Sequence, residues 1–198
     1  MKKSLLILLF SLLISSTSTN AIVSPVGFSF ISKGLHGQFP PIDWSVYGMR
    51  FNVFGAEHKN VVGIDVGGYN VTNELFGGMQ LGLFNYNKKT SYIVLGQIGL
   101  VNTNVGKTFA LGGQLGIFAN NNEGPATIIG IQAAIANLGK QTTIYGWQLG
   151  VYNRAFRVVG FQFGLVNYAD NLHGFQVGLL NMCKSCLIEI MPGINMGF

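Results

Sequence analysis

An eight-residue unit, Gly-x-Gln-x-Gly-x-x-Asn, recurs along most of this chain. Its three clearest copies start at Gly146, Gly160 and Gly174 and are spaced by 14 residues. Earlier and less regular copies start at Gly48, Gly63, Gly78, Leu95, Gly112 and Gly130. Because one short unit is used so many times, the chain must fold by repeating a single structural element.

Within a unit, apolar residues alternate with Gly and Gln. Gly160, Gln162 and Gly164 share one face of the stretch 158–167, and the other face is apolar. A period of two is typical of a β-strand, since a helix would mix the two sets. The links between units are rich in Asn, Gly and Asp, which favour turns. Links of about five residues permit hairpins but not parallel crossovers, so we expect antiparallel strands.

The unit is also nearly palindromic about its Gln, which suits strands that run alternately up and down. About ten strands can be placed between residues 45 and 197, and 26–32 could add another. We therefore expect an all-β fold, an antiparallel up-and-down β-barrel of about 10–12 strands. A single domain would span 22–198, with 22–44 forming an N-terminal arm or a first strand plus loop.

Composition bears on which face of the strands meets water. Only 10% of residues are charged while 48% are hydrophobic, against about 25% charged in ordinary soluble chains. A water-facing surface of Gly and Gln would be unusual for a strand. Apolar residues outside and polar residues inside are typical of outer-membrane barrels, so we expect outer-membrane lipid as a partner. The alternative is a soluble periplasmic protein that encloses an apolar ligand within a Phe-rich face.

Both ends of the sequence carry signals of export. Lys2 and Lys3 precede a short apolar run, and Thr19-Asn20-Ala21 supplies small residues for cleavage, which together predict a signal peptide over 1–21. At the other end, alternating apolar residues lead to Phe198. That pattern is similar to the assembly signal of bacterial outer-membrane barrels, so we expect the barrel-assembly machinery as a further partner. The predicted location is the outer membrane or cell surface of a Gram-negative bacterium.

The repeated units, with VYGMRFNVFG and GIDVGGYN before them, resemble an uncharacterised family of bacterial surface-repeat proteins from spirochaetes and other Gram-negative bacteria. The resemblance covers about residues 44 to 198. It implies a surface or outer-membrane location, and it supplies no catalytic residues.

Seven units carry Gln at their centre, on the face predicted to be interior. We expect these side chains to form a hydrogen-bonded amide network, because neighbouring Gln can supply both donors and acceptors. The alternative is a narrow polar conduit or a small-ligand pocket. The residues are Gln80, Gln97, Gln114, Gln132, Gln148, Gln162 and Gln176.

Three units carry a charged residue in place of the central Gln: Arg50, Asp65 and Glu189. If the strand at 45–54 closes onto the last strand, these side chains would form an interior cluster at the seam. Buried charges need partners because desolvation costs several kcal/mol per ion. The cluster could set the register of closure or select ions or substrates.

Little in the sequence indicates chemistry. Cys183 and Cys186 could form a disulfide in an oxidising compartment, stay as free thiols, or serve a redox or metal role. The three His residues share no spacing, and no catalytic signature or phosphate loop is present, so we expect no enzymatic activity, metal or cofactor. The basic residues are scattered, which argues against a nucleic-acid partner.

The sequence thus predicts an outer-membrane surface protein with a structural or interaction role. A narrow pore or small-molecule transporter, or a soluble carrier of apolar ligands, is the alternative.

Overall fold

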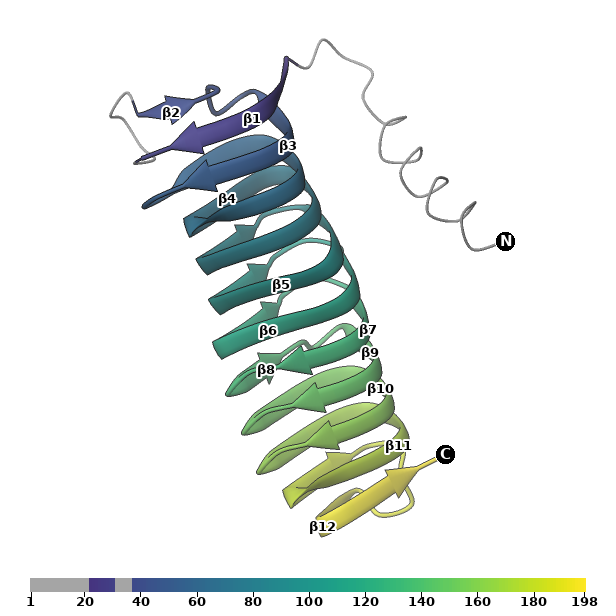
Figure 1. Cartoon of the computed structure of the whole chain (residues 1–198). Coiled ribbons are helices and arrows are strands. Elements are labelled where there is room, and N and C mark those ends of the chain that lie inside the picture. The colour runs from purple at the N-terminus through teal and green to yellow at the C-terminus, as the bar shows by residue number, and fades with distance from the viewer. Residues whose placement is uncertain (1–21, 31–36) are drawn as a thin grey trace.

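The computed structural model describes residues 22–30 and 37–198, and it is a β-solenoid (Figure 1). The chain winds in stacked coils, so that each coil lies beside the coil before it and all the strands belong to one 12-stranded hydrogen-bonded sheet. The strands are β1 (Val23–Ser29), β2 (Gln38–Phe39), β3 (Ser45–Asn52), β4 (Ala56–Asn87), β5 (Thr90–Asn104), β6 (Thr108–Asn122), β7 (Ala126–Ala133), β8 (Ala136–Leu138), β9 (Thr142–Leu149), β10 (Tyr152–Phe163), β11 (Val166–Cys183) and β12 (Ile190–Gly197).

Consecutive coils pair in parallel, with equivalent residues of the repeat in register. Between β9 and β10, Gly146 lies opposite Gly160 and Gln148 lies opposite Gln162. Antiparallel pairing within the described ranges is confined to β1 with β2 and β11 with β12. Each repeat unit therefore stacks on the same unit of the coil before it.

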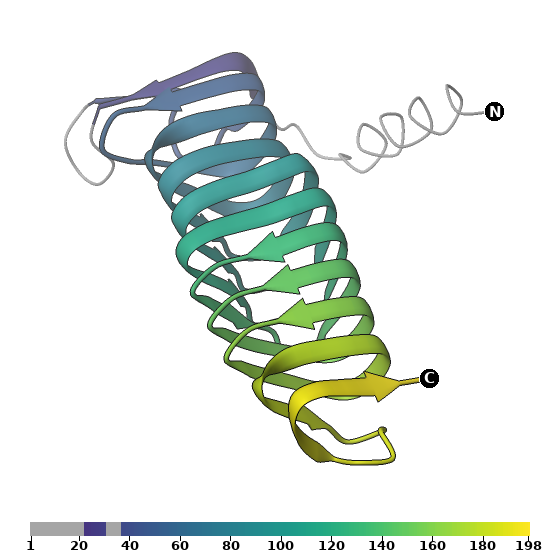
Figure 2. The same ribbon diagram turned by 60° about the horizontal axis from the view of Figure 1, so that its bottom comes forward.

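Each coil contributes to two sheets, because its strands bend between them. The first residues of β10 pair with β8, whereas 157–163 of the same strand pair with β9. We call the sheet that contains β7 and β9 the wide sheet, and the sheet that contains β8 the narrow sheet. Figure 2 shows the two sheets in front and behind, joined by the bends.

Coil length follows from the central residue of each unit. Successive central residues, from Arg50 through Asp65 to Gln176, are separated by 15, 15, 17, 17, 18, 16, 14 and 14 residues. These eight intervals correspond to eight coils. The regular 14-residue spacing seen in the sequence therefore corresponds to the shortest coils of the stack.

The predicted antiparallel up-and-down barrel is wrong. It treated the residues after each unit as a hairpin turn, whereas segments such as β8 form the strands of the narrow sheet. A full circuit of 14 to 18 residues is long enough to return the chain in the same direction, as a parallel crossover requires about a dozen residues. The near-palindrome about Gln therefore does not alternate strand direction.

The first Gly of each unit is required by the stacking. Gly146, Gly160 and Gly174 have φ of 133°, 135° and 138°, a region that favours Gly over residues with a Cβ. A Cβ on Gly160 would lie 2.1 Å from the carbonyl oxygen of Gly146 in the coil before. Leu95 takes this position in its unit, with a φ of 75°.

The two ends of the solenoid differ from its coils. β1 overlaps the segment 26–32, which the sequence indicated as a candidate extra strand, and it pairs in parallel with β3. β12 folds back antiparallel on β11, so this strand caps the stack and does not close a barrel onto the strand at 45–52. The barrel-assembly role predicted for the segment ending at Phe198 therefore loses its structural basis. The predicted signal peptide at 1–21 lies outside the described residues.

Candidate functional site

The seven central Gln side chains form a continuous ladder inside the solenoid. From Gln97 to Gln176, each donates its Nε2–H to the Oε1 of the Gln one coil earlier, over N···O distances from 2.6 to 3.1 Å. All are at most 1% exposed. From Gln80 to Gln162 each amide both donates and accepts, so the buried polar groups satisfy one another along the axis, and the ladder ends at Gln176, whose Oε1 has no partner. The ladder fills the space that a polar conduit would need.

A second ladder, which the sequence reasoning missed, is built from one Asn of each coil, in most coils the Asn that ends the unit. It starts at Asn52 and runs to Asn181, with N···O distances from 2.5 to 2.9 Å between successive side chains. Asn153 Nδ2 also donates to the carbonyl oxygen of Phe163 in the next coil, 2.8 Å away. The signal was present in the sequence, since from Asp65 onward this Asn follows the central residue by five residues, or by six at Asn120.

The Gln ladder ends in an ion pair at its N-terminal side. Gln80 Nε2 donates to Asp65 Oδ2 at 2.9 Å, and Arg50 contacts both carboxylate oxygens of Asp65 at 2.7 Å. Arg50 and Asp65 are both fully buried. A carboxylate can only accept, so it suits the last step of the ladder, and the bidentate Arg balances its charge.

His58 completes this buried end. Arg50 NH1 lies 3.2 Å from His58 Nδ1, which must accept because a guanidinium has no acceptor. His58 Nε2 then donates to the carbonyl oxygen of Pro40 at 3.0 Å. Burial, with the adjacent Arg50 charge, lowers the pKa of His58 from 6.5 to about 4. The imidazole is therefore neutral at pH 7.

The third residue of the predicted charge cluster lies elsewhere. Glu189 is exposed and precedes β12, at the opposite end of the stack from Arg50. The structure thus brings Arg50 and Asp65 together and leaves Glu189 apart, because coils stack along one axis and the two ends never meet. Cys183 and Cys186 form a disulfide before β12.

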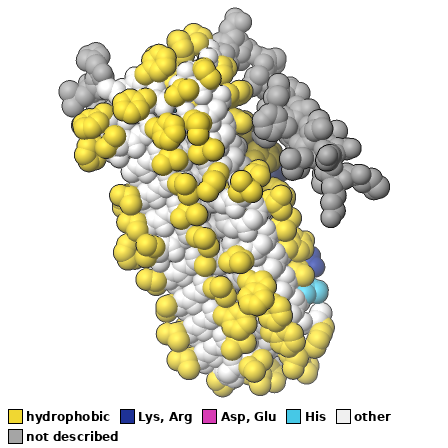
Figure 3. Space-filling view, in the orientation of Figure 1, with side chains coloured by type: hydrophobic (Ala, Val, Ile, Leu, Met, Phe, Trp, Pro, Cys, Tyr) yellow, Lys and Arg dark blue, Asp and Glu magenta, His cyan; other side chains and the backbone are white. Residues whose placement is uncertain are grey.

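The outward side of the wide sheet is apolar. The residues on either side of each central residue point outward there, and many are well exposed, including Leu115 at 41% and Trp147 at 48%. Figure 3 shows these side chains in rows along the stack. The residues are Met49, Phe51, Ile64, Val66, Met79, Leu81, Ile98, Leu115, Ile131, Ala133, Trp147, Leu149, Phe161, Phe163, Phe175 and Val177.

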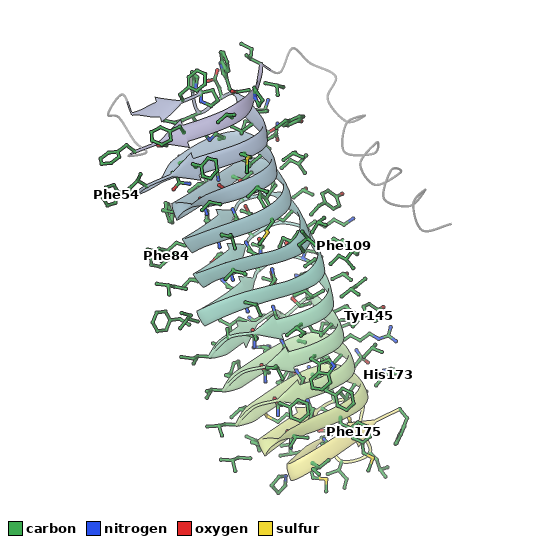
Figure 4. The ribbon with its side chains drawn as sticks, in the orientation of Figure 1. Phe54, Phe84, Phe109, Tyr145, His173 and Phe175 are labelled. Atoms are coloured by element: carbon green, nitrogen blue, oxygen red, sulfur yellow. A yellow bond between two sulfur atoms is a disulfide. The ribbon has the colours of Figure 1, made fainter. Side chains whose placement is uncertain are left out.

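The bend that follows the wide sheet continues this surface. Phe54 and Phe84 mark it along one side of the stack in Figure 4. Together with the outward side of the wide sheet, this bend forms what we call the apolar face. Its exposed large side chains include Val53, Phe54, Leu83, Phe84, Ile117, Phe118, Ile135, Val151, Leu165 and Leu179.

Aromatic rings gather toward the C-terminal end of the apolar face. Trp147 lies with its ring centroid 5.3 Å from that of Phe161 and 5.8 Å from that of Phe163. Phe161 stacks on Phe175 of the next coil at 5.6 Å. Parallel in-register stacking creates this cluster, because it places the same position of the unit on neighbouring strands.

The apolar face is large for a protein surface. Eight strand spacings of about 4.8 Å and a seven-residue width at about 3.3 Å per residue give a sheet area on the order of 900 Å². The largest apolar patch on a typical monomer is about 300–600 Å² and is often functional. None of the side chains named above for the face is charged, and Arg157 stands only at its border, where the chain enters the wide sheet.

Charged side chains lie mostly at the other bend and on the narrow sheet. Several are paired there: Lys59 and Lys89 with Glu74, Lys88 with Glu57, and Lys184 with Asp170. Arg154 lies over the Tyr168 ring on the narrow sheet.

A cavity of about 360 Å³ opens at this side of the molecule. Its lining carries both signs of charge, with Glu123 facing the same space as Lys140 and Arg154. That mixture does not select one class of ligand. Across residues 22–30 and 37–198, no group of three or more His, Cys, Asp or Glu is placed to hold a metal ion. No helix in the described part has the length and apolarity to span a membrane.

No protein-family model, curated protein or solved structure matches this chain. The resemblance to bacterial surface-repeat proteins therefore stays a prediction from the repeat itself.

Proposed function

We propose that this protein is a non-enzymatic surface protein that lies on a lipid bilayer through its apolar face. The observation that carries the proposal is the uncharged apolar face, whose area exceeds the usual limit for a surface left in water. In this proposal the protein is exported and rests on the outer membrane without spanning it, with a structural or interaction role there.

Several features favour lipid over a small apolar ligand. The face lies on the outside of the stack, and the interior that could enclose a ligand is filled by the Gln and Asn ladders. Strand pairing uses the backbone donors and acceptors of the coils within the solenoid. A surface whose backbone groups are already paired can approach the acyl region without leaving them unsatisfied.

The side chains of the face also suit the boundary between headgroups and acyl chains. Tyr145 and Trp147 lie side by side along one strand and are 42% and 48% exposed. Tyr and Trp are enriched at this depth because they combine an apolar ring with a polar group. Binding of this kind scales with the apolar area buried in the interface.

Vesicle flotation with paired variants tests the proposal. Trp147→Lys with Leu115→Lys places two charges in the apolar face. It should weaken binding to phosphatidylcholine vesicles at least tenfold, measured from the fraction that floats over a series of lipid concentrations. Burying one large apolar side chain is worth about 1.5–3 kcal/mol, and a factor of ten is about 1.4 kcal/mol. Thr103→Lys with Asn121→Lys is the matched control, because it adds the same charges to outward positions of the narrow sheet.

Fluorescence quenching by brominated lipids tests the orientation directly. With Trp44→Phe as background, Trp147 is the remaining tryptophan. We expect quenching by lipids brominated on their acyl chains. Unquenched Trp147 in a vesicle-bound sample would show that another surface makes the contact, and equal flotation of the two double variants would refute the proposal.

A further inference from the structure

Three basic residues lie where the chain passes from the bend into the wide sheet, along one border of the apolar face. Arg157 pairs with Thr143 of the preceding coil and points outward on the same side as Val159. Lys107 immediately precedes β6, and Lys140 lies two residues before β9. We call Lys107, Lys140 and Arg157 the basic margin.

Figure 3 supports this position. On the side that it shows, Lys, Arg and His side chains appear only at the right border of the apolar surface, and no acidic side chain is visible among the described residues. Figure 4 places His173 and Tyr145 at the same border. His173 follows Val159 by one coil in the outward row of the wide sheet.

The basic margin also lacks counterions. None of its three side chains has a carboxylate oxygen within 4 Å, whereas four other lysines of the described chain do. Arg157 Nε is covered and makes no hydrogen bond. The acidic residues of this bend are Glu74, Glu123 and Asp170. Glu74 and Asp170 pair with lysines outside the margin, and Glu123 is exposed and accepts a hydrogen bond from Asn121 at 3.1 Å.

We infer that the basic margin binds the phosphate groups of anionic phospholipids while the apolar face contacts the acyl region. This inference rests on the proposed function. Arg157 precedes Phe161 by four residues, about 13 Å along the strand, so a cation at the bend sits beside the inserted rings. The bend turns away from the sheet, which puts the cations at the level of the headgroups, where Lys and Arg attract anionic lipid.

The test compares neutral vesicles of phosphatidylcholine with vesicles that contain 30% phosphatidylglycerol. We expect tighter binding to the anionic vesicles, by about fivefold for each basic residue that reaches the surface. Lys107→Gln with Arg157→Gln should remove about 25-fold of that gain and leave binding to neutral vesicles unchanged. Far-UV circular dichroism checks that the variant remains folded.

Lys59→Gln with Lys184→Gln is the control, because it removes the same net charge from side chains that already pair with carboxylates. A loss equal to that of the margin variant would attribute the effect to net charge and overturn the inference. Equal binding of the wild type to both vesicle types would also overturn it and leave the proposed function standing, whereas binding to neither would refute the proposed function. Release from anionic vesicles by inorganic phosphate at constant ionic strength would assign the margin to free phosphate and overturn the lipid inference.

Discussion

Replacing one ladder Gln by Glu tests how the interior is held together. In the ladder, Gln132 Nε2 donates to Gln114 Oε1 at 3.0 Å, and Gln132 Oε1 accepts from Gln148 Nε2 at 2.8 Å. Glu has nearly the same shape, so Gln132→Glu keeps the packing. One carboxylate oxygen still accepts from Gln148, but the other faces the oxygen of Gln114.

The magnitude follows from the protonation state that this geometry allows. The introduced carboxyl could donate to Gln114 when it is protonated, whereas its ionised form would be a buried charge facing an acceptor. The fold should therefore raise the pKa of the introduced carboxyl above the usual Glu value of about 4.3. If the side chain is still protonated in the fold at pH 7, the loss of stability there is at least about 3.7 kcal/mol, at 1.36 kcal/mol per pKa unit.

The direction of the pH dependence is the distinguishing feature. A carboxyl whose pKa is raised by folding stays protonated in both states below pH 4, so the variant should match the wild type there. Its stability falls as pH rises through 4.3, because the unfolded chain releases the proton and the folded chain does not. The difference between variant and wild type should therefore grow from near zero at pH 4 to its full size at pH 7.

Urea unfolding followed by far-UV circular dichroism, at pH values from 4 to 7, measures this difference. Gln141→Glu makes the same chemical change at an exposed bend residue and should shift the transition little at any pH. A Gln132→Glu difference below about 1 kcal/mol at pH 7, or one of equal size at pH 4 and pH 7, would mean that the ladder is not a closed chain of amide hydrogen bonds.

Three further predictions concern the ends and the backbone of the stack. Gly160→Ala should lower the free energy of unfolding by at least about 1–3 kcal/mol, since φ is 135° and the added Cβ would meet the Gly146 carbonyl. In Gly96→Ala the added Cβ makes only an ordinary contact at 3.6 Å, so thermal denaturation should show a smaller loss of stability. Arg50→Met should lower the free energy of unfolding by about 3–5 kcal/mol, because it leaves the buried Asp65 carboxylate without its partner. Lys88→Met, which breaks an exposed pair with Glu57, should change the free energy of unfolding by about 0–1 kcal/mol. The pKa of His58, lowered from 6.5 to about 4, should make the wild type lose up to about 3 kcal/mol as pH falls from 6.5 to 4, and His58→Gln should lack this component in pH-dependent urea unfolding.

The local structure could be predicted from the sequence because strand alternation depends on neighbouring residues. Placing Gln162 opposite to Phe161 and Phe163 across the strand needs only a period of two, and the structure has Gln162 fully buried with the rings outside. The contact between Arg50 and Asp65 was also predicted, since both replace Gln at the same position of adjacent units, and the structure pairs them.

The direction of the strands could not be read from that alternation. A strand has the same side-chain pattern whether its neighbour runs parallel or antiparallel, so the choice depended on the residues between units. Asn153 and Asn167 indicate parallel strands. This Asn occurs on only one side of the central Gln, so the unit is not a true palindrome, and Asn153 stacks in register on Asn167 one coil away. The prediction that Glu189 lies beside Arg50 was wrong for the same reason, since a barrel brings its first and last strands together and a solenoid keeps them apart.

The solenoid has polar side chains inside and large apolar side chains outside, and this arrangement links its stability to membrane binding. Only a thin row of buried apolar residues, including Ile128, Ile144 and Val158, runs through the interior, while larger apolar side chains lie outside. In water the ladders and the backbone pairing hold the coils together, and the apolar face contributes little because it stays hydrated. A bilayer that covers the face binds the folded chain and stabilises it by mass action. Thermal denaturation should therefore shift upward in proportion to the logarithm of vesicle concentration. The Trp147→Lys, Leu115→Lys variant should lose that shift while keeping its transition in buffer, because both substitutions lie outside the ladders.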